Sequence, residues 1–248
     1  MVFVKPKTRY GAFAYHLLFS AIIFAILAYL IVFVWYPGFL FWTDGGWQGV
    51  RLIAGVDLVL GPFLTLIIYK ATKPTLKFDL AVIACVQIVA LAYGAWLVHE
   101  ERPRAVVFAD AMIRPLAATV FPSVVEEEAL KSINKIGGGS LAWLYVDVKK
   151  QIDESMDDMA RIEASMRELK ENGLFHVRYE AYQPFAESFS QIVDQALDVS
   201  EYFNDEQPTA VKEGNVVYRF RSRYAYGLIE LDGETLEEVA LHNVTHGL

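Results

Sequence analysis

The fold is decided by the stretch GVDLVLGPFLTLII, residues 55–68. It is apolar enough to lie inside a membrane, yet it contains one acidic residue, Asp57. A charged side chain at the centre of a bilayer costs about 3 kcal/mol on insertion scales. The rest of the chain must therefore provide partners for Asp57. The role of the neighbouring Gly55, Gly61 and Pro62 also has to be explained.

Charge and hydrophobicity are distributed unevenly along the chain. It has 248 residues, of which 54% are hydrophobic, and a net charge of −8. Residues 1–98 hold seven of the 22 Lys and Arg residues and three of the 30 acidic residues, so residues 99–248 hold 15 and 27. This predicts an apolar region followed by an acidic one. The acidic region would repel phosphates, which excludes nucleic acid as a partner, and the single cysteine, Cys85, excludes a disulfide framework.

Three apolar runs, at residues 11–36, 47–69 and 79–98, are each long enough to cross a bilayer as a helix. The first run is too long for the apolar core of a cleaved signal peptide. It ends in WYPG, residues 35–38, where aromatic side chains typical of a membrane interface precede a helix stop. The sequence therefore predicts three retained transmembrane helices in the lipid bilayer.

The loop charges predict the orientation of these spans. Three Lys or Arg residues precede the first span, loop 37–46 has none, and loop 70–78 has three. Positive loops stay on the cytoplasmic side. We therefore expect a cytoplasmic N-terminus and an acidic C-terminal region outside the cytoplasm, which in a Gram-negative cell is the periplasm.

Beyond Pro103 the pattern changes to alternating strands and helices, typical of an α+β domain over residues 104–248. Together with region 1–98, this predicts a membrane protein with three transmembrane α-helices followed by a soluble α+β domain that has a mixed or antiparallel sheet. The helices are predicted at 123–135, 153–171 and 185–200, and the strands at 104–109, 112–119, 141–148, 175–182, 216–221 and 224–231.

Asp57 is expected about 8 residues, or about 12 Å, below the outer interface, near the middle of a hydrocarbon core of about 30 Å. Tyr29, Gln87 and Tyr93 are predicted at a similar depth and could form hydrogen bonds with its carboxyl group. Three roles for Asp57 are open. It could be a clasp that holds the helices together, a docking point for a polar or cationic group of another membrane protein, or part of a proton relay. No chain of carboxylates and histidines accompanies it, which disfavours the relay.

Gly55, Gly61 and Pro62 are interpreted together with Asp57. Pro62 removes a backbone hydrogen bond and weakens the helix about one turn below the carboxyl group. The two glycines permit close approach of neighbouring helices. The alternative is an ordinary kinked transmembrane helix.

The sequence contains no motif that indicates an enzyme. It has no Gly-rich phosphate loop, nucleophile elbow or metal-spaced set of Cys and His, so we predict no catalytic residue, cofactor or metal site. His16, His99 and His176 are scattered. His242 and His246 are four residues apart but close to the end of the chain, where a solvated tail is predicted.

The first 120 residues contain several distinctive motifs: HLL at 16–18, WYPG at 35–38, GVDLVLGP at 55–62, and Gln87 followed by ALAYG at 90–94. With these motifs, this part of the chain resembles the type IV pilin accessory family TfpX/TfpZ. The remainder of the chain is similar to that family mainly in length and in its α+β pattern.

This resemblance implies a multi-pass protein of the bacterial inner membrane that acts beside a particular major type IV pilin and the inner-membrane pilus machinery. It would favour pilus assembly, or the balance of extension and retraction, without entering the fibre, and it brings no catalytic residues. Two other classes are a membrane-anchored sensor or regulator whose outer domain binds a ligand, and a membrane enzyme that modifies pilin or lipid. The enzyme would need several acidic or histidine residues at one membrane depth.

Overall fold

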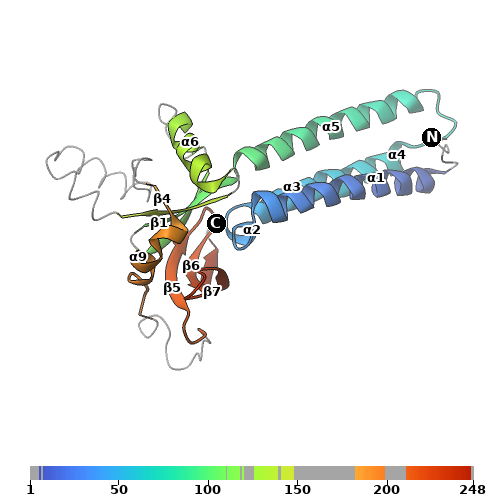
Figure 1. Cartoon of the computed structure of the whole chain (residues 1–248). Helices are drawn as coiled ribbons and strands as arrows, with labels where there is room; N and C mark the ends of the chain where they lie inside the picture. The colour runs from blue at the N-terminus through green and yellow to red at the C-terminus, as the bar shows by residue number, and fades with distance from the viewer. Residues whose placement is uncertain are drawn as a thin grey trace. The chain divides into compact units, whose positions relative to one another are not determined.

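The computed structural model describes residues 6, 8–109, 111–117, 119, 126–138, 141–147, 182–198 and 211–246. The chain forms two compact units, residues 1–102 and residues 103–248. The first unit is helical, and the second is built on a sheet (Figure 1). This confirms the predicted fold class of a membrane-anchored α+β protein.

The helical unit contains three helices that are long and apolar enough to cross a membrane: Arg9–Trp35, Gly46–Ile68 and Leu76–Glu100. Their bounds lie within three residues of the predicted spans. The first two spans each include a π-helical segment. The elements are α1 (Arg9–Tyr29), η1 (Leu30–Trp35), α2 (Leu40–Thr43), α3 (Gly46–Ala54), η2 (Gly55–Leu60), α4 (Gly61–Ile68) and α5 (Leu76–Glu100).

These helices direct apolar side chains outward. Phe19, Phe63 and Val86 are all more than half exposed, and only 11% of the most apolar window of the first span is buried within the protein. Helices that are hydrophobic on all sides belong in a protein core or a membrane. The exposed apolar surface therefore supports a membrane-associated protein.

The span containing α3 and α4 lies between its neighbours. Its α4 segment packs against both α1 and α5, and α3 packs against α5. A Cβ atom added at Gly49 would lie 2.8 Å from Val98 Cγ2, so α3 approaches α5 closely. The Tyr36 hydroxyl donates to the Val98 carbonyl at 3.1 Å and fastens the end of the first span to α5.

The second unit has a seven-stranded mixed sheet in the order β4-β3-β1-β2-β5-β6-β7. β1 pairs in parallel with β3, and β2 with β5, whereas the other neighbours are antiparallel. The strands are β1 (Pro103–Ala109), β2 (Met112–Ala117), β3 (Ala142–Val146), β4 (Gln183–Pro184), β5 (Val216–Arg221), β6 (Ala225–Leu231) and β7 (Glu238–His246).

Successive strand residues point to opposite sides of the sheet, so both faces carry apolar side chains. Helices cover parts of both faces. On one face, Val107 and Leu144 pack with Ile133 of α6 (Glu126–Gly137). On the other, the Phe108 and Tyr218 rings meet edge to face at 4.9 Å. The Tyr218 hydroxyl donates to the carbonyl of Ile192 in α9. On this face, η5 (Phe185–Ser188) leads into α9 (Phe189–Val193).

The helix predicted over 185–200 is wrong in extent, since regular helix ends at Val193. The Leu197 amide donates to the Val217 carbonyl at 3.0 Å. The chain therefore leaves the helix to bond β5, and a tertiary backbone partner overrides the helical periodicity. The predicted helix 153–171 and nearly all of the predicted strand 175–182 lie outside the described residues.

The predicted solvated tail near the end of the chain is also wrong. Residues 238–246 form β7, which pairs antiparallel with β6 at one edge of the described sheet. Only partly buried, β7 lacks a clear alternation of buried and exposed residues, and Asn243 has a positive φ of 50° within it. The local sequence pattern of residues 238–246 therefore does not indicate a strand, and the strand is defined by its pairing with β6.

Candidate functional site

The acidic residue of the second span is enclosed by the bundle. Asp57 lies in the π-helical segment η2 and is only 4% exposed. A π-helical turn has one extra residue, and such turns occur frequently at functional sites. Here the wider turn directly precedes Pro62, whose ring lacks an N–H and disfavours the regular α-helical bond in the turn before it. Pro62 itself is buried at the start of α4.

Asp57 receives hydrogen bonds from both neighbouring spans. Ser20 Oγ in α1 donates to Asp57 Oδ1 at 3.1 Å, and Gln87 Nε2 in α5 lies 3.5 Å from the same oxygen. Asp57 Oδ2 is buried and has no hydrogen-bond partner among the described residues. One carboxyl group therefore joins all three spans, which is the geometry of a clasp.

The two glycines of the motif have different surroundings. A Cβ atom at Gly61 would overlap the amide of Gln87, whereas one at Gly55 would meet no atom within 4 Å. Gly61 therefore provides the space through which the Gln87 side chain reaches Asp57. Gly55 has no comparable packing role in the described structure.

Tyr29 and Tyr93 do not join Asp57, contrary to the sequence interpretation. They are 60% and 61% exposed, and their rings lie beside Phe33 and Trp96 respectively. Within the described part of the chain, neither hydroxyl bonds to Asp57. Of the three residues predicted near Asp57, Gln87 does approach it. Position along a helix does not specify which side of the helix faces its neighbours, so Tyr29 and Tyr93 could not be told apart from Gln87.

Three polar residues that the sequence interpretation missed complete the cluster: His16, Ser20 and Thr65. His16 Nδ1 lies 2.6 Å from Thr65 Oγ1, and Gln87 is close to the same histidine. Ser20 and Thr65 are 2% and 3% exposed. The usable signal was spacing, since His16 and Ser20 are four residues apart and so share a helix face, as do Asp57, Gly61 and Thr65.

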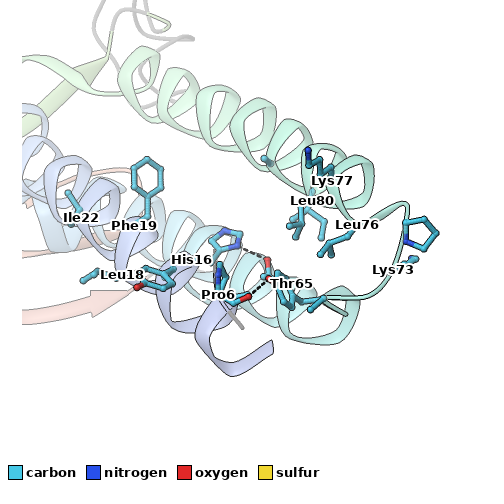
Figure 2. A pocket seen from close by; sticks show the side chains of 17 residues that line it. Pro6, His16, Leu18, Phe19, Ile22, Thr65, Lys73, Leu76, Lys77 and Leu80 are labelled. Atoms are coloured by element: carbon cyan, nitrogen blue, oxygen red, sulfur yellow. Dashed lines mark hydrogen bonds between the residues drawn. The ribbon is translucent and has the colours of Figure 1, made fainter. Parts of the chain in front are cut away.

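Toward the Lys-containing loop that joins α4 to α5, the bundle opens into a groove. α1 and α5 both pack on α4 but make little contact with each other, and the space between them has a volume of about 780 Å³. Figure 2 shows His16 and Thr65 at its floor, with Leu76 and Leu80 of α5 facing them. Its lining is largely apolar, and Lys73 and Lys77 contribute to it near the loop.

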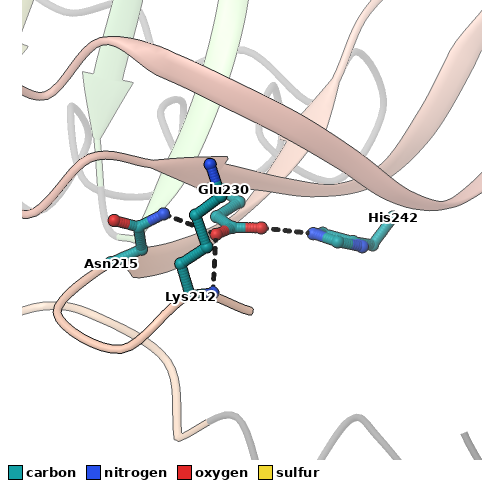
Figure 3. Close-up of polar contacts among 4 residues, drawn as sticks. All are labelled: Lys212, Asn215, Glu230 and His242. Atoms are coloured by element: carbon teal, nitrogen blue, oxygen red, sulfur yellow. Dashed lines mark hydrogen bonds and ion pairs between the residues drawn. The ribbon is translucent and has the colours of Figure 1, made fainter. Parts of the chain in front are cut away.

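The sheet unit has a buried polar cluster of its own, centred on Glu230 of β6, which is 1% exposed. Its Oε1 accepts from the Lys212 amide at 3.1 Å and from Asn215 Nδ2, and its Oε2 lies 2.7 Å from His242 Nε2 (Figure 3). Burial of Glu230 raises its pKa, but these three hydrogen bonds outweigh burial and hold the pKa below its ordinary value.

This cluster joins the loop before β5 to β6 and β7 and is best explained as structural. His242 is thus held by a carboxylate in a strand, and His246 ends the same strand. The described residues contain no group of three His, Cys, Asp or Glu side chains placed to hold a metal ion.

Comparison with curated proteins finds fimbrial assembly proteins of Dichelobacter nodosus. The protein of serogroups C1 and C2 is 38% identical over 104 residues, which are 41% of this chain and 79% of that relative. The chain belongs to this family of fimbrial assembly proteins. Those of serogroups I and E1 are 38% and 36% identical over 104 residues, and the match spans 40% of each. No family model matches the chain, and no solved structure matches it.

Proposed function

We propose that this protein is a non-enzymatic accessory factor of the bacterial inner membrane that assists type IV pilus biogenesis through contact with the major pilin. The observation that carries the proposal is the 38% identity to a fimbrial assembly protein over most of that relative's length. Three membrane-capable helices and a separate α+β unit are consistent with it. We also propose that the chain is a member of the TfpX/TfpZ group. Its N-terminus is cytoplasmic in this proposal, and its sheet unit is periplasmic.

In this proposal, the cluster around Asp57 closes the bundle, and pilin contacts the outer helix faces. The carboxyl group is 4% exposed and bonded from two neighbouring spans, so a partner could reach it only if the bundle opened. By contrast, α4 presents Val59, Phe63 and Ile67 outward, each more than half exposed. An apolar face of this kind is what a second helix packs against within a bilayer.

Site-specific crosslinking in living cells tests the pilin contact. A photoreactive residue is placed at Phe63 or Val86, on lipid-facing sides of α4 and α5, and at the buried Ile53 as a control. We expect crosslinks to the major pilin from at least one exposed position and none from Ile53. Crosslinks only to other copies of this chain, together with normal piliation after deletion of the gene, would refute the function.

The role of the carboxyl group is tested separately with Asp57→Asn, which keeps the side-chain shape and removes the possibility of charge. If Asp57 acts as a clasp, the Asp57→Asn protein should be less stable. The yield of pilin crosslinks should then fall only in proportion to the amount of the variant protein in the cell. Loss of pilin crosslinks at normal level and stability would instead assign Asp57 to direct docking of pilin.

A further inference from the structure

We propose that the groove between α1 and α5 is a binding site for an anionic phospholipid, with an acyl chain in the apolar groove and the phosphate beside Lys73 and Lys77. The proposal is independent of the pilin contact. It rests on the shape of the groove, the chemistry of its lining and the charge at its mouth.

The groove follows from how the three spans pack. α1 and α5 are held on opposite sides of α4, and the polar pair His16–Thr65 lies at the floor between them. Its volume of about 780 Å³ is within the range of ligand pockets. The sides are formed by Phe19 and Ile22 of α1 and by Leu80 and Ile83 of α5. An empty apolar groove of this size inside a membrane would forfeit packing contacts, and an acyl chain restores them.

The charge at the mouth indicates which lipid fits. Lys73 and Lys77 both line the groove. Lys73 Nζ lies 2.5 Å from the Asp79 carboxylate, whereas Lys77 has no ion pair in the described part of the chain. One positive charge therefore remains uncompensated where the apolar lining ends. Basic pockets between transmembrane helices on the cytoplasmic side are typical sites for anionic headgroups.

The position of the mouth agrees with this assignment. The loop after α4 and the first turn of α5 together carry three lysines and lie at the same end of the bundle as the start of α1 (Figure 1). On the predicted orientation this is the cytoplasmic side, where anionic lipids give the membrane surface its negative potential.

Lys70 provides a matched control. It is exposed in the loop before α5 and has the same charge as Lys77, but it does not line the groove. A general attraction between a basic loop and anionic lipid would depend equally on both lysines. A site at the groove would depend on Lys77.

The test uses the full chain purified in a neutral detergent and native mass spectrometry to count bound lipid. Phosphatidylglycerol and phosphatidylethanolamine with identical acyl chains are added in turn. We expect preferential retention of phosphatidylglycerol, reduced roughly fivefold by Lys77→Gln. Lys77→Arg should preserve the preferential retention of phosphatidylglycerol, and Lys70→Gln should leave this preference unchanged. Leu80→Trp, which fills the groove without altering its charge, should reduce retention of both lipids, with the fold checked by circular dichroism.

Three outcomes would overturn the proposal. Equal retention of the two lipids, which both carry a phosphate, would mean that the groove does not select for the net negative charge of the headgroup. Equal effects of Lys77→Gln and Lys70→Gln would place binding on the lysine-rich end of the bundle as a whole rather than on the groove. A photoreactive residue at Leu80 that crosslinks only to another protein, with no lipid retained, would assign the groove to a partner helix. None of these results bears on the pilus assembly function.

Discussion

Asp57 in the helical unit and Glu230 in the sheet unit are both buried carboxyl groups, and the two are supported differently. Asp57 in the helical unit is bonded through a single oxygen by Ser20 and Gln87, and its other oxygen is buried without a described partner. Glu230 in the sheet unit is bonded through both oxygens by a backbone amide, an amide side chain and a histidine.

The difference follows from what each architecture can supply. In a helix every backbone amide beyond the first turn is already used, so Asp57 depends on side chains from neighbouring helices. Glu230 lies beside a loop with free backbone donors and between strands whose side chains approach closely. Substitutions at Asp57 therefore report on the packing of the helices against one another. Substitutions at Glu230 report on the order of the strands β6 and β7 and of the loop before β5.

The largest expected effect is at Glu230. Glu230→Ala removes the acceptor for three donors and should lower the free energy of opening of β6 and β7 by about 3 kcal/mol. Hydrogen exchange of the full chain in detergent measures this opening. The exposed Glu237→Ala is the control and should change it by less than about 0.5 kcal/mol. Equal effects of the two variants would contradict a structural role for the Glu230 cluster.

Acid should produce a smaller loss at the same place. The hydrogen bonds hold the folded-state pKa of Glu230 below its ordinary value. Its stabilisation is therefore complete above the unfolded pKa, about 4.3, and is lost as the pH falls through the lower folded value. Urea unfolding of the sheet unit, followed by Trp143 fluorescence between pH 6 and pH 3 in a variant without the other tryptophans, measures the loss.

The control for this pH dependence is Glu230→Gln, which cannot titrate. The variant should show a flatter acid dependence than the parent chain. The exposed turn residue Asp232 also has a lowered pKa, because it accepts hydrogen bonds from the Thr235 and Glu234 amides, and it should account for part of the remaining slope. An unchanged slope in Glu230→Gln would show that other groups carry the effect.

In the helical unit, the two glycines provide the sharpest test of packing. Gly61→Ala should displace Gln87 from Asp57 and destabilise the bundle by about 1–2 kcal/mol. Gly55→Ala should be neutral or stabilising by up to about 1 kcal/mol, because alanine is the better helix former. Thermal unfolding in detergent compares the pair. Equal destabilisation by both would show that the motif requires small residues generally rather than space for Gln87.

The smallest expected difference is between two hydroxyl groups of the first span. Ser20→Ala removes a hydrogen bond to Asp57 and should cost about 1 kcal/mol. Tyr29→Phe removes an exposed hydroxyl and should cost less than about 0.5 kcal/mol. The same unfolding measurement applies. A larger loss for Tyr29→Phe would restore the sequence interpretation in which Tyr29 bonds Asp57.

Much of the fold could be predicted from local patterns. The ends of the three long apolar helices lie within three residues of the predicted spans, because the length of an apolar run and the residues that flank it limit such a helix. The hairpin of β1 and β2 and the pairing of β5 with β6 follow from short apolar runs separated by turns. The strand β7 was missed because its pattern is weak and its pairing with β6 is nonlocal.

The candidate site was predicted only in part. Asp57 and Gln87 were recognised as polar residues at one membrane depth, and Gly61 as a point of close approach. Ser20 and Thr65 were missed because hydroxyl-bearing residues are inconspicuous in an apolar run.

By itself, the amino-acid sequence determined the three long apolar helices, their predicted orientation, the acidic α+β unit and the presence of a carboxyl group within an apolar helix, because each depends on the composition of one segment. Only the tertiary structure decided that Tyr29 and Tyr93 face outward, that Gly61 rather than Gly55 makes room for Gln87, and that a groove separates α1 from α5. The physical reason is rotational: hydrophobicity places a helix in the membrane, but in a helix that is apolar on nearly all sides only packing against its neighbours fixes which side turns inward.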